Sequence, residues 1–479
     1  MRKTKIVCTI GPATESKEML EKMMNAGMNV ARINFSHGGY EENEEKINNI
    51  KEVRAKLNKP VALMLDTKGP EIRTGVLESG NEKVTITEGD TFTFVNEDII
   101  GNETKTSISY KNLYQDVKIG SKILVDDGAL EFEVIEIKGK DVIAKALNTA
   151  KLGSRKTVNV PGLKLNLPAL SEKDITDIKN GIKAEFDFIA ASFVRRASDV
   201  EEIRKLLNEN GGEHIKIISK IESQEGIDNF EEILELSDGI MVARGDMGVE
   251  IPMEQVPIVQ KYFIKRCNEA GKPVITATQM LESMQSNPRA TRAEVSDVAN
   301  AIFDITGAIM LSGESAMGKY PVECVNTMCK IAASVEANIK YYRRSLRREE
   351  ERKNRDYEFM LAHSVVTTAR DMEADAIFAY TEKGDSPRMV ASFMPECPIY
   401  AVTTNETTYR QLALTWNVTP ILIKDKKKPN DVIEEGIQIA KQNRYLEEGN
   451  VVVIAGGASI LANHGEEAVN RTIGGVLKV

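Results

Sequence analysis

Two apolar segments, 217–223 and 238–250, carry ionisable side chains where their hydrophobic runs end. Lys220 and Glu222 lie at the end of the first run, and Asp246 follows the second. As neighbouring strands of a parallel sheet, the segments would bring all three groups to one edge of that sheet. Carboxylate oxygens are the ligands that hard divalent cations prefer, so Glu222 and Asp246 could share an ion that leaves positions open for substrate. Lys220 has a second interpretation, a structural salt bridge with Glu222, because an unpaired buried lysine is costly.

A glycine motif, Gly245-Asp246-Met247-Gly248, stands just before a predicted helix. The free N–H groups and the dipole at a helix start attract anions, so the motif predicts an anion site beside the cation site. The alternative is that these glycines serve only the turn into the helix.

Alternating apolar and amphipathic segments predict the scaffold that positions these groups. Residues 1–69 and 169–340 contain eight apolar segments in this alternation, which is typical of a (β/α)8 TIM barrel. Residues 70–168 interrupt it with stretches of period two, such as KVTITEGDTFTFV, and with turn signals, which predict an all-β insertion, a β-barrel lid domain. Residues 341–479 return to the alternation and predict an open α/β C-terminal regulatory domain. The expected fold class is α/β.

Composition and charge restrict the class of protein. The formal net charge of -9 argues against a nucleic-acid surface. The longest apolar stretch, VVVIAGGASILA, is shorter than the ~20 residues that a membrane span needs. Five scattered cysteines show no paired or metal-ligand spacing, which favours a reducing compartment. We therefore expect a cytoplasmic protein that binds neither nucleic acid nor a membrane.

The active sites of such barrels lie at the carboxyl ends of the strands. Nearly every predicted strand ends in polar or ionic side chains: Arg32, Asn34, Ser36, His37, Asp66, Thr67, Ser192, Lys220, Glu222, Asp246, Thr278, Ser312 and Glu314. Two neighbouring strand ends supply oxygen donors that could hold a cation or hydrogen-bond one another: Asn34, Ser36, Asp66 and Thr67. Three basic side chains are placed where they could contact phosphate: Arg32, Arg73 and Lys156. Each of them, taken alone, could equally be an ordinary surface charge. The residues alone indicate a barrel enzyme that handles phosphate or carboxylate anions with a divalent metal.

Seven motifs in fixed order extend this interpretation: KIVCTIGPA, ARINFSHG, LDTKGPEIRTG, SKIES, VARGDMGVE, TATQMLESM and IMLSGESA. Because of these motifs, the chain resembles the pyruvate kinase family over nearly its whole length. The resemblance implies glycolytic phosphoryl transfer from phosphoenolpyruvate to ADP, followed by protonation of the enolate to pyruvate. It also implies a requirement for Mg2+ (or Mn2+) and K+, and a cytoplasmic homotetramer.

The resemblance assigns roles to the residues that match the family motifs. The implied Mg2+ ligands are Glu222 and Asp246, and the implied K+ ligands are Asn34, Ser36, Asp66 and Thr67. Lys220 would stabilise the transferring phosphoryl group, and the substrate would be held by Arg32, Gly245, Asp246 and Thr278. The implied nucleotide contacts are Asn34, His37, Arg73 and Lys156. The proton would reach the enolate through a network that includes Thr278, Ser312 and Glu314.

The chain departs from the common family pattern at Ile305, Gly307 and Ser315, and some members have a lysine at Met317. In the C-terminal unit, the loop that binds a phosphorylated effector in many relatives retains Thr381, Lys383, Ser386 and Arg388. It also contains Glu382 and Asp385, whose charges repel phosphate. The sequence therefore leaves two alternatives: the loop binds a phosphorylated effector, or it has lost that site.

Two other functions compete with the kinase. A metal-dependent aldolase or lyase acting on a pyruvate enolate would use the same rim, but it leaves Arg73, Lys156 and the lid unexplained. A catalytically inactive barrel kept for binding is disfavoured by the intact Lys220, Glu222 and Asp246.

Overall fold

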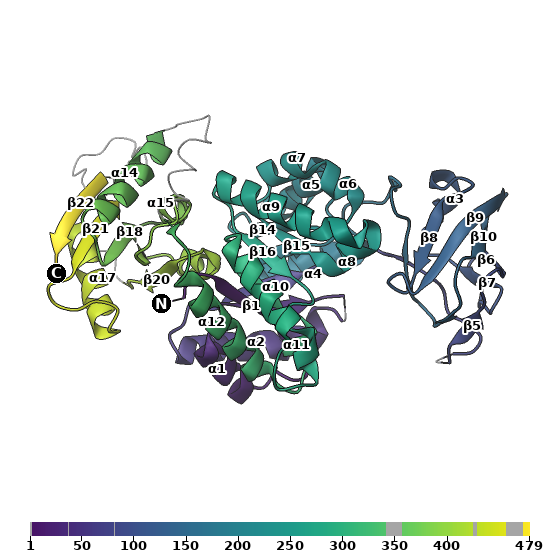
Figure 1. Ribbon diagram of the computed structural model, residues 1–479, viewed down its shortest axis with the longest axis horizontal. Helices are drawn as coiled ribbons and strands as arrows, with labels where there is room; N and C mark the ends of the chain where they lie inside the picture. The colour runs from purple at the N-terminus through teal and green to yellow at the C-terminus, as the bar shows by residue number, and fades with distance from the viewer. Residues whose placement is uncertain (1, 37, 81, 342–356, 425–428, 457–472) are drawn as a thin grey trace.

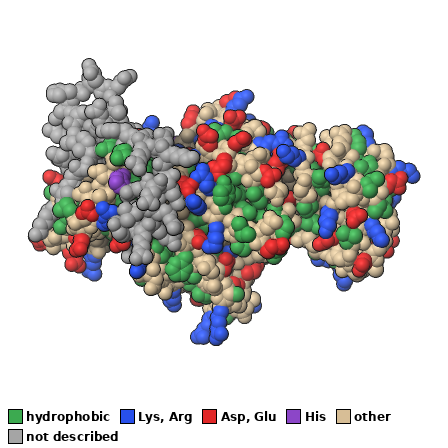
Figure 2. Space-filling model, turned by 45° about the horizontal axis from the view of Figure 1, so that its top comes forward, with side chains coloured by type: hydrophobic (Ala, Val, Ile, Leu, Met, Phe, Trp, Pro, Cys, Tyr) green, Lys and Arg blue, Asp and Glu red, His purple; other side chains and the backbone are tan. Residues whose placement is uncertain are grey.

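The computed structural model describes residues 2–36, 38–80, 82–341, 357–424, 429–456 and 473–479. Three bodies follow one another along the molecule: a C-terminal sheet unit, a central barrel and an all-β unit at the opposite end (Figure 1). In the space-filling view, the all-β unit at the right meets the barrel at a narrowing (Figure 2). The described residues contain no helix that is long and apolar enough to cross a bilayer.

The central body is a closed barrel of eight parallel strands, in the order β1-β17-β16-β15-β14-β13-β3-β2. The strands are short apolar runs buried on both faces, as parallel sheets require. Their bounds are β1 (Lys5–Thr9), β2 (Val30–Asn34), β3 (Ala62–Asp66), β13 (Phe188–Ala191), β14 (Lys216–Ile221), β15 (Gly239–Ala243), β16 (Val274–Ala277) and β17 (Ala308–Leu311). The predicted (β/α)8 fold is confirmed, with β14 and β15 as its fifth and sixth strands.

Amphipathic helices surround these strands (Figure 1): α1 (Lys17–Ala26), α2 (Tyr40–Lys56), α4 (Glu172–Lys183), α5 (Ala197–Glu209), α7 (Phe230–Leu236), α9 (Val256–Ala270), α10 (Arg292–Phe303) and α12 (Pro321–Glu336). Ser16, Ser171 and Thr291 cap three of them through their hydroxyl groups. Three shorter helices follow strand ends directly: α6 (Gln224–Asp228), α8 (Arg244–Glu250) and α11 (Gly313–Ala316). The glycine motif that was expected before a helix lies inside α8, because the helix begins as soon as β15 ends.

The all-β unit, called the lid below, is inserted between β3 and α4. Its main sheet has the order β4-β12-β8-β9-β10-β6-β7, and β5 pairs with β11. Their bounds are β4 (Ile72–Arg73), β5 (Val84–Ile86), β6 (Thr91–Val95), β7 (Lys105–Ser107), β8 (Lys122–Val125), β9 (Leu130–Lys138), β10 (Asp141–Ala146), β11 (Ala150–Leu152) and β12 (Thr157–Asn159), with α3 (Leu113–Asp116) beside them. An isolated bridge between Thr74 and Ile108 joins the two edges, so the sheet curls around a core that includes Phe92, Phe94 and Phe132.

The C-terminal unit is an open sheet of order β20-β19-β18-β21-β22. Its strands are β18 (Ala376–Tyr380), β19 (Ile399–Thr403), β20 (Val418–Leu422), β21 (Val451–Gly456) and β22 (Ile473–Lys478). Its helices are α14 (Tyr357–Asp371), α15 (Asp385–Ala391), α16 (Glu406–Gln411) and α17 (Pro429–Gln442), with the short 3-10 helix η3 (Leu412–Leu414). The predicted open α/β sheet is confirmed, and it has an additional antiparallel edge strand, β22, that the sequence pattern did not predict.

The C-terminal unit closes the amino end of the barrel. Leu414 packs with the side chains that fill the barrel interior, among them Val7 and Ile218. Beside it, Arg410 donates to Asp187 Oδ1 at 2.8 Å, and Asp187 is completely buried. The opposite, carboxyl end of the barrel therefore remains open toward the lid.

Candidate active site

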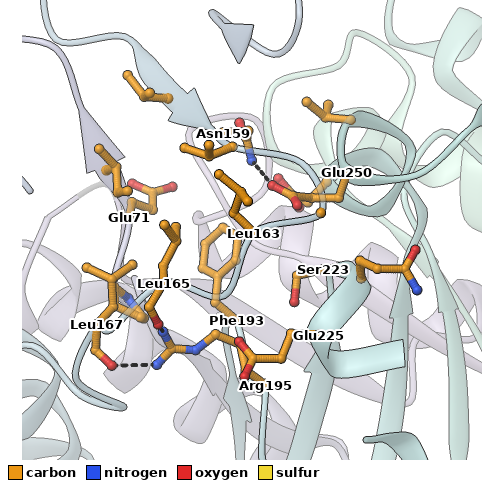
Figure 3. A pocket seen from close by; sticks show the side chains of 18 of the residues that line it. Glu71, Asn159, Leu163, Leu165, Leu167, Phe193, Arg195, Ser223, Glu225 and Glu250 are labelled. Atoms are coloured by element: carbon orange, nitrogen blue, oxygen red, sulfur yellow. Dashed lines mark hydrogen bonds between the residues drawn. The ribbon is translucent and has the colours of Figure 1, made fainter. Parts of the chain in front are cut away.

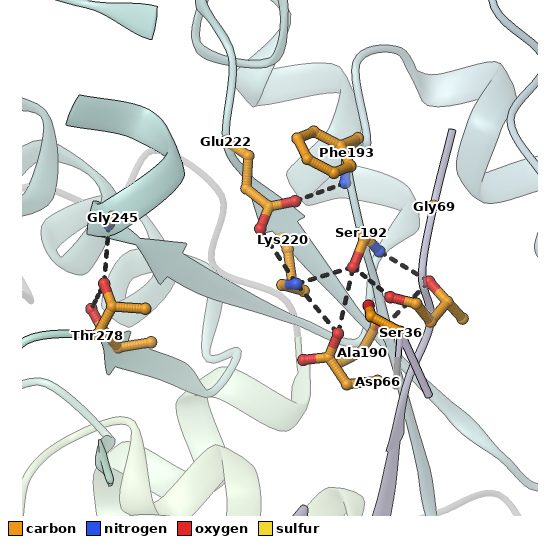
Figure 4. Close-up of polar contacts among 12 residues, drawn as sticks. Ser36, Asp66, Gly69, Ala190, Ser192, Phe193, Lys220, Glu222, Gly245 and Thr278 are labelled. Carbon is orange, nitrogen blue, oxygen red and sulfur yellow. Dashed lines mark hydrogen bonds and ion pairs between the residues drawn. The ribbon is translucent and has the colours of Figure 1, made fainter. Parts of the chain in front are cut away.

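Lys220 is the centre of the polar cluster at the carboxyl end of the barrel (Figure 4). Its Nζ atom lies 3.0 Å from Asp66 Oδ1 and 3.1 Å from Glu222 Oε1. It also donates to Ser192 Oγ at 2.7 Å. The salt bridge with Glu222 that the sequence allowed is present, and Asp66 supplies a second partner. These contacts hold the buried ammonium group at one position on the rim.

Asp66 is shared between two cations. Arg32 Nε donates to its Oδ2 at 2.6 Å, while Lys220 occupies the side of Oδ1. Burial would raise the pKa of Asp66, but Arg32 and Lys220 outweigh burial and lower it. Burial likewise lowers the pKa of Lys220, but Asp66 and Glu222 reverse this effect and raise it. The rim therefore carries two charged donors that share one aspartate, an arrangement suited to a phosphate.

Glu222 has an oxygen without a hydrogen-bond partner among the described residues. Its Oε2 accepts from Phe193 N at 2.6 Å, but Oε1 is buried and makes no hydrogen bond of good geometry, although Lys220 Nζ is near. Burial raises the pKa of Glu222; Lys220 opposes this rise, and Asp246 adds to it. A divalent cation between Glu222 and Asp246 would give Oε1 a partner and remove the repulsion between the carboxylates.

The two carboxylates thus fit the implied metal. Asp246 is exposed to the cleft, whereas Glu222 is buried. Within the described part of the chain, no three His, Cys, Asp or Glu side chains are grouped closely enough to hold an ion. The remaining ligands would come from substrate and water, as in catalytic sites that keep open positions.

The four expected oxygen donors of a monovalent site lie together. Asn34 and Asp66 are register partners on β2 and β3, and Ser36 and Thr67 follow them. Hydrogen bonding within this region is also present: Asn34 Oδ1 accepts from Ser36 N at 3.0 Å, and Thr67 Oγ1 accepts from Ser192 N at 3.0 Å. The donor set consists of oxygens alone, which fits a hard cation such as K+.

Thr278 faces this cluster from the other side of the rim (Figure 4). Gly245 N donates to Thr278 Oγ1 at 2.8 Å, and that hydroxyl donates to Ala277 O at 2.6 Å. Thr278 has φ 67°, an unfavourable conformation for a β-branched residue. Arg244 donates to Thr278 O at 2.6 Å and helps to hold this conformation. Such strain is common where a side chain must be positioned for function.

Glu314 contacts backbone groups rather than the open cleft. It is completely buried, and its oxygens accept from Leu281 N at 3.0 Å and from Ser312 N at 2.7 Å. It therefore ties the segment after β16 to the segment after β17. The Ser312 hydroxyl is buried and has no hydrogen-bond partner among the described residues.

Comparison with known proteins decides the family. The family model described as pyruvate kinase, barrel domain, matches residues 1–325, and the model described as pyruvate kinase, alpha/beta domain, matches residues 360–468. The chain belongs to the pyruvate kinase family.

Individual pyruvate kinases are similar over nearly the whole chain. The pyruvate kinase of Clostridium acetobutylicum is 51% identical over 459 residues, covering 95% of this chain and 96% of the relative. That of Staphylococcus epidermidis is 52% identical over 460 residues, covering 95% of this chain and 78% of the longer relative. A crystal structure of a pyruvate kinase from Cryptosporidium parvum superposes with a TM-score of 0.93 at 39% identity, covering 100% of this chain and 96% of that one.

Two of the four expected nucleotide residues, Arg73 and Lys156, lie on the lid and form ion pairs with acidic neighbours, whereas Asn34 ends the barrel strand β2. Arg73 forms an ion pair with Glu71 at 2.7 Å, and Lys156 Nζ lies 2.8 Å from Asp126 Oδ1. The structure does not bring these two cations into the Lys220 cluster. His37, the remaining candidate, lies outside the described residues.

A cleft separates lid and barrel beside the pyruvate kinase site (Figure 3). Its lining includes Glu71, Arg195, Asp246 and Glu250. Asn159 on the lid donates to Glu250 Oε1 on the barrel at 2.8 Å across this cleft. Asp246, one of the two implied metal ligands, therefore lies in the same cleft as the lid residues.

The loop of residues 381–388, where the family resemblance led us to expect an effector, makes contacts among its own side chains. Thr381 Oγ1 accepts from Gly384 N at 2.8 Å. Arg388 lies 3.3 Å from Asp385 Oδ1 and donates to Lys383 O at 3.2 Å. An incoming phosphate would have to compete with Asp385 for Arg388.

Several contacts of the site had no assigned role in the sequence. Ser192 was recognised only as a polar strand end, yet its hydroxyl joins Lys220, Asp66 and Thr67. Arg244 was likewise found as a polar strand end without a role, and it donates to Thr278 O. The contact of the Phe193 amide with Glu222 was missed, because backbone donors leave no signal in residue types.

Proposed function

We propose that this chain transfers the phosphoryl group of phosphoenolpyruvate to ADP and releases pyruvate and ATP. The observation that carries this proposal is the placement of Lys220 between Asp66 and Glu222, whose buried Oε1 has no hydrogen-bond partner among the residues that the structure describes. The full-length similarity to pyruvate kinases supports it.

The substrate is held from both sides of the rim. Arg32 and Lys220 bind the phosphate of phosphoenolpyruvate as fixed positive charges. The helix start at Gly245 and Asp246, together with Thr278, orients the carboxylate. As the phosphoryl group moves, Lys220 neutralises its charge without rearranging, because its neighbours already hold it.

Two cations complete the site. Glu222 and Asp246 hold Mg2+ or Mn2+, which neutralises charge on the substrate oxygens when bound. Asn34, Ser36, Asp66 and Thr67 supply the oxygens of the K+ site. Backbone amides orient two of these donors: Phe193 N donates to Glu222, and Ser36 N donates to Asn34.

ADP binds between barrel and lid. Arg73 and Lys156 exchange Glu71 and Asp126 for the nucleotide phosphates, with Asn34 and His37 on the barrel side. Movement of the lid toward the barrel then excludes water from the transferring group.

The proton reaches the enolate through hydroxyl groups on the Thr278 side. Thr278 Oγ1 and Ser312 Oγ, which has no hydrogen-bond partner within the described part of the chain, are the groups that can relay it. Glu314 acts by positioning both segments through their amides.

The wider assignments belong to the same proposal. The chain forms a cytoplasmic homotetramer of glycolysis, with domains at 1–69 and 169–340, 70–168, and 341–479. A phosphorylated effector would bind Thr381, Lys383, Ser386 and Arg388 once Arg388 leaves Asp385.

Pyruvate release from phosphoenolpyruvate, measured with and without ADP, tests the function. Release that requires ADP, Mg2+ and K+ is expected. ADP-independent release from an enolate donor would favour the aldolase or lyase, for which the comparisons give no support, and absence of release would favour a binding protein.

A further inference from the structure

One buried carboxylate contacts both connections between barrel and lid. The chain leaves β3 through Lys68 and Gly69 and returns through Ser171 before α4. Asp174, which is completely buried, accepts from Lys68 N at 3.0 Å and from Gly69 N at 3.2 Å through Oδ1. Its Oδ2 accepts from Ser171 N at 3.0 Å and from Ser171 Oγ at 2.6 Å.

The outgoing connection turns at Gly69. This residue has φ 73°, and a Cβ atom there would lie 2.8 Å from Ser192 Cβ and 2.9 Å from Phe193 Cδ2. Glycine is therefore required both by its conformation and by space. Two residues earlier, just after β3, Thr67 N donates to Ala190 O at 3.0 Å, so the barrel itself holds the chain up to Thr67. Asp174 holds the next two residues.

The returning connection has a second anchor. Arg195, only 7% exposed, donates to Leu167 O at 2.9 Å and to Pro168 O at 3.1 Å (Figure 3). Its own backbone N–H donates to Asp199 on α5 at 2.9 Å. Asp174 thus holds the outgoing connection to the lid, at Lys68 and Gly69. Arg195 and Asp174 together hold the returning connection.

We propose that Asp174 is a positioning residue that fixes the hinge of the lid and so determines how Arg73 and Lys156 approach the nucleotide. Without its carboxylate, two buried amides lose their acceptor and the outgoing connection gains conformational freedom. A lid on a looser hinge loses more freedom when it closes, so nucleotide binding weakens. The proposed phosphoenolpyruvate contacts, Arg32, Lys220 and Thr278, belong to the barrel and, within the described part of the chain, make no hydrogen bond to Asp174.

The structure offers a matched control for helix capping. Asp174 and Ser171 form the capping box of α4, so Ser171→Ala weakens the cap while leaving the hinge amides with their acceptor. Asp174→Ala removes both functions. Asp174→Asn keeps one neutral acceptor oxygen, which binds amides more weakly than a carboxylate does.

Hydrogen exchange of a peptide spanning residues 67–72, followed by mass spectrometry, measures the hinge without any substrate. We expect exchange to be about tenfold faster in Asp174→Ala, intermediate in Asp174→Asn and close to wild type in Ser171→Ala. In steady-state kinetics, we expect KM for ADP to rise about tenfold in Asp174→Ala, with KM for phosphoenolpyruvate within twofold.

Equal exchange in Asp174→Asn and Ser171→Ala would overturn the proposal, and this comparison stands even where Asp174→Ala does not fold. Equal rises in both KM values would also overturn it, because they indicate general damage to the barrel. The kinetic arm rests on the proposed function: wild-type protein without ADP-dependent pyruvate release refutes that function, while the exchange arm still tests the hinge.

Discussion

The Lys220 ammonium group lies 3.0 Å from Asp66 Oδ1, while Arg32 holds the other oxygen of the same carboxylate at 2.6 Å. Each cation is therefore fixed by an anion that it shares with the other. Replacing Lys220 leaves Arg32 paired with Asp66. The effect of Lys220 on turnover can therefore be measured separately from binding of the substrate phosphate by Arg32.

For Lys220→Met, we expect kcat to fall about 10²- to 10³-fold, because a preorganised charge beside the transferring group is lost. Binding of phosphoenolpyruvate, measured by calorimetry, should persist through Arg32. Lys216→Met is the control, since Lys216 lies at the other end of β14 and pairs with Asp238 at 3.1 Å. Turnover within tenfold of wild type would contradict the role of Lys220.

Asp126→Asn should lower KM for ADP about two- to fivefold, because an ion pair of this exposure competes for Lys156 by roughly 1 kcal/mol at most. Steady-state kinetics with varied ADP measures the effect. Asp98→Asn provides the lid control, as Asp98 is highly exposed and pairs with Lys111 at 2.6 Å. A higher KM for ADP in Asp126→Asn would show that Asp126 positions Lys156 instead.

Two substitutions of Thr278 separate the role of its hydroxyl group from that of its strained backbone. Thr278→Val removes the acceptor of Gly245 N and should reduce kcat about 10²-fold. Thr278→Ser keeps the hydroxyl and removes the β-branch at φ 67°, so kcat should stay within about fivefold and thermal stability should not fall. Similar kcat values for the two variants would exclude a role for the hydroxyl.

Asp187→Ala should lower the free energy of unfolding by about 3–5 kcal/mol, because it leaves the guanidinium groups of Arg410 and Arg54 without their buried partner. The midpoint of urea unfolding measures this change. Glu185→Gln, which affects an exposed pair with Lys51, should change stability by less than about 0.5 kcal/mol. An equally small effect of Asp187→Ala would show that the contact between barrel and C-terminal unit contributes little.

Replacing K+ by tetramethylammonium at constant ionic strength should strongly reduce pyruvate release. The proposed K+ site takes its oxygens from Asn34, Ser36, Asp66 and Thr67, and a large organic cation cannot replace a small hard ion among them. Release measured over a series of monovalent cations checks the expectation. Equal rates in all salts would remove the K+ site from the proposal.

The sequence predicted the barrel and the position of its key groups for one physical reason: short buried strands leave a strong apolar pattern, and parallel strands expose their carboxyl ends at one edge. Lys220, Asp66 and Thr278 could be placed at the rim in this way. The contact of Glu222 with the Phe193 amide and the backbone contacts of Glu314 could not, because backbone donors carry no residue signature. Strand β22 was missed because its sequence, IGGVLK, contains two glycines, which weaken a strand pattern.

Leu414 has a consequence for evolution and engineering of this fold. A side chain from the C-terminal unit completes the packing inside the barrel, and Asn417 N donates to Lys3 O beside it at 2.9 Å. The C-terminal unit therefore contributes part of the barrel's own core. A chimaera that exchanges everything after residue 341 with a relative must carry over a compatible 410–418 segment, and a chain that ends at 341 leaves the barrel interior open to water.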